Sequence, residues 1–89
     1  MNKEKVFELI DGERQYQDLK WGPEGRPESD ENYSVAEWLV YIEKHLSFAK
    51  DAVYHLSRVN ALCNVRKIAA LAVACMEFNE TLSREQEDQ

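Results

Sequence analysis

Apolar residues recur at helical spacing in three stretches of the chain, and a stretch rich in glycine and proline separates the first two. In residues 3–20, Val6, Leu9 and Ile10 follow the i, i+3, i+4 spacing that puts side chains on one helical face. Asn2 precedes this run and suits the N-cap position. The pattern predicts a first helix over residues 3–20 with the three apolar side chains in the core.

The stretch WGPEGRPESDENY, residues 21–33, contains both prolines and two of the three glycines of the chain. These residues interrupt helices and strands, so the stretch is predicted to be a loop. A loop of about a dozen residues is long for so small a domain, and such loops are usually lids, binding loops or flexible connections. The sequence leaves a functional lid and simple flexibility as alternatives.

A second helix is predicted over residues 34–57, beginning with the sequence SVAE. Ser34 and Glu37 have the spacing of a capping box, in which each side chain bonds to the other residue's backbone N–H. Apolar residues then recur on one face of this helix. The predicted core stripe consists of Val35, Trp38, Leu39, Ile42, Leu46, Ala49 and Val53.

A turn is expected at residues 58–61, with Asn60 as its tightest residue. A third helix is predicted over residues 62–82, with IAALAVACMEF at its centre. This segment is apolar on nearly every side, and such a helix should be buried on every side. Two further helices of one short chain cannot supply that cover. The pattern therefore predicts an all-α fold of three helices that forms a helical bundle by dimerisation.

The chain has 89 residues, which suffice for one domain with a thin core. We expect residues 1–83 to form that domain and residues 84–89 to be a frayed acidic tail. The formal net charge of −6 argues against non-specific binding to nucleic acids or anionic membranes. The start of the chain lacks the apolar run of a signal peptide, and no segment reaches the roughly 18 apolar residues of a membrane span.

Cys63 and Cys75 are the two cysteines, and they lie twelve residues apart in the apolar third segment. The spacing lacks the CxxC pairs of a zinc site. Cysteine in such a context behaves as a small apolar residue. Together with the absence of a signal peptide, this predicts a cytoplasmic protein with reduced thiols.

The first predicted helix carries the strongest candidate for a binding site. Its apolar face continues for two turns as Glu13, Gln17 and Lys20, with Arg14 and Trp21 beside it. Polar groups that face a core need partners, because unpaired burial costs on the order of a few kcal/mol. Either this helix end is solvated, or it lines a polar cleft under the following loop. Because a cation beside an aromatic ring suits a nucleotide, these five residues are the candidate ligand-binding residues.

The sequence YIEKHLS, residues 41–47, places Glu43, Lys44 and His45 side by side. Successive helical residues are about 100° apart, so Glu43 and His45 lie on opposite flanks of the core stripe. They therefore cannot bind one metal ion from a single helix. His45 is expected to be a structural residue near aromatic neighbours such as Tyr41 and Phe48.

The segments ERQYQDLKWG, AEWLVYIEKHL and VRKIAALAVACMEF resemble a small phage- and bacterial-type branch of the MazG-like all-α nucleotide pyrophosphohydrolase superfamily. The resemblance covers about residues 7–78. It implies four-helix bundles formed by self-association, and cleavage of nucleoside triphosphates to monophosphate and pyrophosphate. It also implies Mg²⁺ bound by an EExxE pattern and a later ExxD pattern, which supply the oxygen ligands that this cation prefers.

Of the five acids implied by the resemblance, Glu43 is present. Lys44 and Ser47 stand at the second and third positions, and Asn64 and Lys67 stand at the two later ones. A lone carboxylate cannot hold a catalytic magnesium cluster, so Glu43 is at most a residual metal ligand. We expect it to meet Lys67 instead.

The sequence thus predicts a catalytically degenerate MazG-like protein. It would be a homodimer or higher homo-oligomer that serves as a binding or regulatory module, with a nucleotide or small anion as ligand and no cofactor. One alternative is an active Mg²⁺-dependent pyrophosphohydrolase with an atypical site. That site would combine Glu13, Glu37 and Glu43 with loop acids such as Asp30 or Glu31. The other alternative is a protein–protein interaction module of phage origin that uses the third helix.

Overall fold

The computed structural model describes residues 1–20 and 34–87. Within these ranges the chain forms α1 (Lys3–Lys20), α2 (Val35–Tyr54), α3 (Arg58–Phe78) and the single turn α4 (Arg84–Glu87), with no strand. The predicted all-α class with three main helices is confirmed. The predicted loop at residues 21–33 lies outside the described residues.

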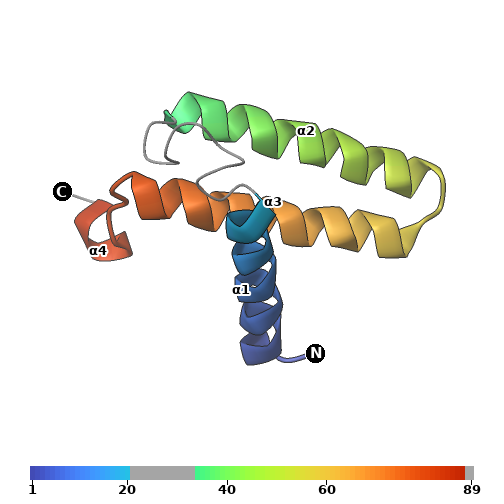
Figure 1. Ribbon diagram of the computed structural model, residues 1–89, viewed down its shortest axis with the longest axis horizontal. Helices are drawn as coiled ribbons and strands as arrows, with labels where there is room; N and C mark the ends of the chain where they lie inside the picture. Colours follow the sequence, from blue (N-terminus) through green and yellow to red (C-terminus); the bar gives the residue numbers. More distant parts are fainter. Residues whose placement is uncertain (21–33, 88–89) are drawn as a thin grey trace.

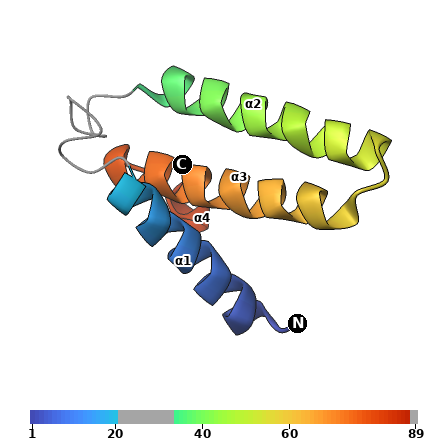
Figure 2. The ribbon, with the colours of Figure 1, turned by 45° about the vertical axis from the view of Figure 1, so that its right-hand side comes forward.

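The helices α2 and α3 form an antiparallel hairpin, whereas α1 crosses α3 steeply (Figure 1). Figure 2 shows the N-terminal half of α1 pointing away from this hairpin. The helix α3 contacts both α1 and α2, while the backbones of α1 and α2 do not approach each other in the described ranges. α3 is therefore the central helix of the chain.

The hydrophobic core lies between α2 and α3. Trp38 of α2 packs against Leu71 and Ala74 of α3, and each of these three residues is 1% exposed. The rings of Trp38 and Phe78 are parallel, with centroids 6.4 Å apart. Ile42 is half-buried against the same cluster. Large side chains contribute little else to the core, because Trp38 and Leu71 are the large ones that are fully buried in the described residues.

The buried face of α1 is polar, which corrects a prediction from the sequence. Val6 and Leu9, expected in the core, are 39% and 42% exposed, and Ile10 is half-buried. They lie on the half of α1 that projects away from the hairpin, so the apolar stripe exists without an element to cover it. The buried residues of α1 are Glu13, Arg14 and Gln17.

The predicted core stripe of α2 is buried only in part. Trp38 and Ala49 are buried and Ile42 is half-buried. The other predicted members of the stripe are exposed in the single chain, because α3 covers only a narrow strip of this helix. These exposed members are Val35, Leu39, Leu46 and Val53.

Local side-chain chemistry defines the helix starts. The N–H of Lys5 donates to Asn2 Oδ1 at 2.8 Å, which confirms the predicted first N-cap. Ser34 and Glu37 form both halves of the predicted capping box. The tail that was predicted to be frayed begins with α4, which Ser83 caps. Residues 88–89 lie outside the described residues.

The turn between α2 and α3 comes earlier than predicted. α3 spans Arg58–Phe78 and so precedes the predicted range 62–82 at both ends. The cause is Ser57, whose hydroxyl accepts from the N–H of Asn60 and caps the helix. Asn60, expected in the turn, therefore lies in the first turn of α3.

Leu56 adopts a backbone conformation that leucine rarely takes. Its φ is +60°, and the residue is 93% exposed. The N–H of Ser57 donates to the carbonyl of Ala52 at 2.8 Å, and that of Leu56 donates to Val53 at 2.9 Å. This is the bond pattern of a Schellman motif, in which glycine usually occupies the left-handed position. Leucine there costs roughly 1–2 kcal/mol.

Within the described ranges, α3 is the one helix long and apolar enough to cross a membrane, judged by length and composition only. The sequence analysis did not identify α3 as such a helix, because it looked for an uninterrupted run of apolar residues. The feature is weak evidence for membrane insertion, because the core helix of a globular protein passes the same test. Here α3 is the helix against which both α1 and α2 pack.

Trp38→Ala is expected to lower the free energy of unfolding by about 3–5 kcal/mol, because it leaves a cavity beside Leu71. Urea denaturation followed by circular dichroism, at one fixed protein concentration, measures the change. Leu19→Ala is the control, since Leu19 is 84% exposed, and it should change stability by less than about 0.5 kcal/mol. Equal effects of the two substitutions would show that the core does not lie between α2 and α3.

Candidate functional site

Three polar side chains of α1 are buried where the helix meets α3. Glu13 is 8% exposed, Arg14 6% and Gln17 4%. The i, i+1, i+4 spacing places them on one side of α1. We call these three residues, together with Arg66 and Glu77 of α3, the polar joint. It contains three of the five residues that the sequence predicts to bind a ligand.

Glu13 is paired with Arg66 at the polar joint. Arg66 Nε donates to Glu13 Oε1 at 2.7 Å, and the side chains are 38% and 7% exposed respectively. The hydrogen bond to Glu13 raises the pKa of the Arg66 guanidinium above its ordinary value, although burial acts in the opposite direction. Arg66 therefore stays charged at any physiological pH and neutralises a carboxylate that is almost fully buried.

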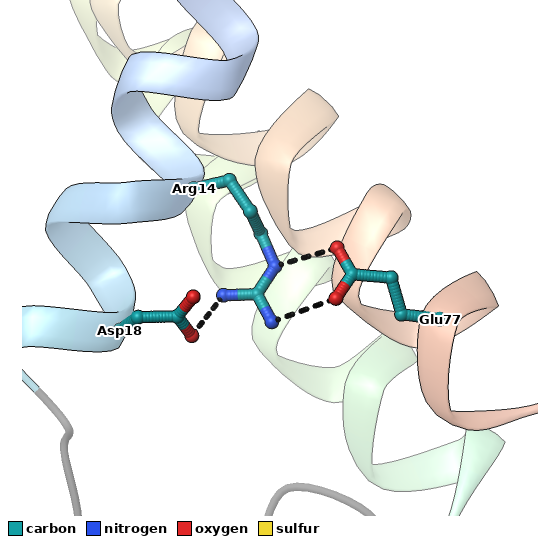
Figure 3. Close-up of polar contacts among 3 residues, drawn as sticks. All are labelled: Arg14, Asp18 and Glu77. Atoms are coloured by element: carbon teal, nitrogen blue, oxygen red, sulfur yellow. Dashed lines mark hydrogen bonds and ion pairs between the residues drawn. The ribbon is translucent and has the colours of Figure 1, made fainter.

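Arg14 is held between two carboxylates, as Figure 3 shows. Its Nε donates to Glu77 Oε1 at 3.1 Å, its Nη2 to Glu77 Oε2 at 3.3 Å, and its Nη1 to Asp18 Oδ1 at 2.6 Å. The guanidinium carbon lies 5.9 Å from the centre of the Phe78 ring. This forked geometry is one that arginine can provide and lysine cannot. An anionic ligand at Arg14 would compete with these two carboxylates for the guanidinium charge.

Gln17 and Lys20 differ from the paired residues of the joint. Gln17 Oε1 is buried and has no hydrogen-bond partner in the structure. An unpaired buried amide oxygen costs about 1–3 kcal/mol. Lys20 ends α1 and is exposed, and no ion pair of Lys20 is found among the described residues. Trp21, the remaining candidate, lies outside the described residues.

The structure excludes the solvated alternative for the polar end of α1, because Glu13, Arg14 and Gln17 are buried. Arg14 lines a groove between α1 and α3, and its charge is paired with Glu77. Glu13 is paired with Arg66. The loop predicted to cap a cleft here lies outside the described residues. Sequence analysis missed those partners, Arg66 and Glu77. The available signal was the pattern of charges around an apolar segment: Arg66 and Lys67 precede residues 68–76, and Glu77 follows them.

The structure does not join Glu43 to Lys67. Glu43 is exposed on α2 and Lys67 is half-buried on α3, and no ion pair connects them in the described residues. The reason is helical geometry: Glu43 lies about 100° around α2 from Ile42, the residue that packs on the core. The expected replacement of a metal by Lys67 is therefore wrong.

His45 lies beside Phe48, one of the aromatic neighbours expected for it. Its Nδ1 lies 3.4 Å from Asn64 Oδ1, and its ring meets Phe48 edge to face with centroids 5.6 Å apart. Asn64 also donates to the carbonyl of Asn60 at 3.0 Å. The contact ties α2 to the first turns of α3, close to the end of the hairpin.

The carboxylates proposed for an alternative metal site do not converge. In the part of the chain that the structure describes, no group of three or more His, Cys, Asp or Glu side chains could hold a metal ion. Glu37 caps α2, Glu13 is paired with α3, and Glu43 is exposed. Asp30 and Glu31 lie outside the described residues.

Both cysteines are free thiols. Cys75 packs against the core cluster, as predicted for a small apolar residue. Cys63 is half-buried, and its Sγ lies 3.9 Å from Arg66 Nη1. Neither side chain belongs to a group that could bind a metal in the described ranges.

Comparison of the chain with protein-family models, with curated proteins and with solved structures gave no match. The resemblance to the MazG-like superfamily therefore stays a prediction that rests on the three sequence segments. The same holds for ligand binding by Glu13, Arg14, Gln17, Lys20 and Trp21, and for Glu43 as a residual metal ligand.

Arg14→Lys is expected to lower the free energy of unfolding by about 1–3 kcal/mol, because lysine cannot bond to Glu77 and Asp18 in the same forked arrangement. Urea denaturation measures the change. Arg84→Lys is the matched control, since Arg84 is 84% exposed and pairs with Glu87 on the surface. Its effect should stay below about 0.5 kcal/mol. If Arg14→Lys behaved like the control, the polar joint would not hold α1 to α3.

Proposed function

We propose that the chain is a non-catalytic, self-associating helical binding protein whose basic unit is a homodimer. The observation that carries this proposal is the apolar surface that one chain leaves exposed. On α2, for example, Leu39 is 54%, Val40 64% and Phe48 44% exposed. Exposure of many large apolar side chains on one small chain is typical of an interface, because single chains in water rarely leave extensive apolar surface open.

The central helix supports the same proposal. Leu62, Val65 and Met76 of α3 are 55%, 52% and 50% exposed, although the helix is apolar on nearly every side. α2 covers one side of α3, and the polar joint of α1 covers part of another. A second chain would supply the missing cover, as in bundles built from two hairpins.

The dimensions of the chain agree with this interpretation. The chain exposes 7118 Å², whereas a folded monomer of 10.4 kDa exposes about 5,400 Å². Its radius of gyration is 14.5 Å, compared with about 12 Å for a compact domain of this length. This surplus surface of about 1,700 Å², which is counted over all 89 residues and over polar and apolar atoms alike, is larger than the roughly 800 Å² that each partner buries in a standard interface.

Two features support a role without catalysis. In the described residues, no group of His, Cys, Asp or Glu side chains could hold a metal ion. In addition, four of the five positions at which the resemblance implies acids hold other residues. These are Lys44, Ser47, Asn64 and Lys67. Two of the four are cationic and would repel Mg²⁺.

A nucleotide or another small anion is the ligand class that this proposal retains for the end of α1. Lys20 is exposed there, whereas the charge of Arg14 is already shared between Asp18 and Glu77. An anion would meet Lys20 first, and at Arg14 it would compete with two carboxylates. We therefore expect weak binding that decreases as the salt concentration rises.

Titration calorimetry with nucleoside mono-, di- and triphosphates tests this ligand. Binding with a dissociation constant of about 10 µM to 1 mM is expected, which corresponds to roughly −7 to −4 kcal/mol. Lys20→Ala should weaken it several-fold, while Lys50→Ala, an exposed lysine on α2, should not. If no heat of binding is measured at millimolar nucleotide, with or without Mg²⁺, the proposal of a nucleotide ligand is wrong.

Sedimentation velocity of the wild-type chain tests self-association. Because the surplus surface is larger than a standard interface, we expect a dimer at concentrations of about 10 µM and above. A species with the 10.4 kDa mass of one chain at about 100 µM would overturn the proposal.

An interaction module for a different protein is the second candidate. The exposed apolar side chains of α2 and α3 favour it, because a foreign amphipathic helix could cover them as well as a second copy could. Sedimentation separates the candidates. A homodimer covers this surface, whereas a stable monomer leaves it open to another protein.

A further inference from the structure

The end of the α2–α3 hairpin carries a cluster of protruding apolar side chains, which we call the hairpin tip. It combines four residues from the last turn of α2, the connecting turn and the first turn of α3. They are Val53, Tyr54, Leu56 and Val59, which are 63%, 83%, 93% and 71% exposed. No other part of the described chain covers them, and the tip lies at the far end of the hairpin from α4 (Figure 1).

Leu56 is the least expected of these residues. At φ +60° glycine would fit without strain, and a leucine that is 93% exposed gains no burial within its own chain. The hydrogen bonds from Ser57 to Ala52 and from Leu56 to Val53 hold the turn in one shape. The turn therefore holds the backbone of Leu56 in one conformation, and its apolar side chain stays exposed at the edge of a shallow hollow that Val53, Ala61 and Leu62 also line.

A groove of about 280 Å³ lies between α1 and α3, beside the polar joint. Its lining residues are Phe7, Ile10, Asp11, Arg14, Val73 and Glu77. The walls of the groove are mainly apolar. Its charged groups are the carboxylates of Asp11 and Glu77 and the guanidinium of Arg14. Arg14 is already bonded to Glu77. The charge left at the rim is that of Asp11, whose carboxylate accepts from the neutral Gln15 and has no ion pair within residues 1–20 and 34–87.

We propose that Leu56 of one chain inserts into the α1–α3 groove of a second copy, with Arg58 facing Asp11 at the rim. This inference rests on the proposed self-association and names the surfaces that form it. In a two-fold dimer the contact occurs twice, because each chain supplies one tip and one groove. The protruding side chain and the hollow that receives it are both present, unpartnered, on the single chain.

Charge and area both favour a second copy as the occupant. Arg58 follows Leu56 by two residues, is exposed, and has no ion pair among the described residues. Asp11 offers the opposite charge on the groove side. Two tip–groove contacts also cover Phe7 and Ile10 of α1, which lie on the apolar face that the chain itself leaves open. Covering this face accounts for part of the surplus surface of the chain.

Substitutions at Leu56 test the contact by sedimentation equilibrium of the full chain. Leu56→Asp should raise the dimer dissociation constant about tenfold or more, since a carboxylate would enter an apolar groove with an acidic rim. Leu56→Gly should also weaken the dimer while leaving the helix content unchanged, because glycine suits the left-handed turn. Leu19→Asp is the matched control: Leu19 is 84% exposed on α1 but does not line the groove, so the dissociation constant should stay unchanged.

A charge exchange tests the partner at the rim. Arg58→Glu and Asp11→Lys should each weaken the dimer several-fold, and the double variant should restore it to near the wild-type dissociation constant. Both positions are exposed in the single chain, so neither change should unfold it. Recovery in the double variant would be specific to a contact between these two residues.

The outcomes separate this inference from the proposed function. A wild-type chain that stays monomeric would refute the proposed self-association and, with it, the contact. A wild-type dimer whose dissociation constant does not change in Leu56→Asp or in the charge variants would leave self-association intact and overturn the tip–groove contact alone.

Discussion

The helix α3 has more apolar surface than the other described residues cover, and several features of the structure follow from this imbalance. α2 covers one side through Trp38, which packs on Leu71 and Ala74. The helix α1 also contacts α3, but its buried residues are polar, so it adds little apolar burial. The apolar half of α1 projects away from the hairpin (Figure 2). As a result, α2 and α3 are only partly covered, and α1 is exposed on its apolar side.

The polar joint explains why α1 takes this position. Glu13 and Arg14 are adjacent in sequence but bond in opposite directions along α3, to Arg66 and Glu77. Two ion pairs separated in this way fix both the place and the angle at which α1 crosses. Partly buried ion pairs add little net stability, because desolvation offsets most of the attraction. They favour one position for α1, and in the proposed dimer further stability would come from apolar surface covered by a second chain.

Features encoded by neighbouring residues could be predicted from the sequence, and those encoded by distant residues could not. Asn2, Ser34 and Glu37 act within one helical turn, so the two helix starts were predicted correctly. The polar stripe of α1 was recognised, but its partners lie 53 and 63 residues away, and no local pattern connects them. Periodicity identified the apolar face of α1 correctly without indicating which element would cover it.

The turn before α3 shows how local preferences compete. Asn60 favours turns, and it was assigned to one, but the cap provided by Ser57 moved the helix start ahead of it. Leu56 then had to take the left-handed position, which a sequence-based interpretation reserves for glycine or asparagine. An exposed leucine in this strained position is the observation from which the proposed tip–groove contact starts.

Small-angle X-ray scattering across a dilution series tests the central claim, that one chain leaves apolar surface for a second copy to cover. The account predicts a scattering mass of two chains and a radius of gyration well above the 14.5 Å of the single chain. A mass of 10.4 kDa with a radius near 14.5 Å at every concentration would contradict it, because the exposed apolar surface would then remain in contact with water.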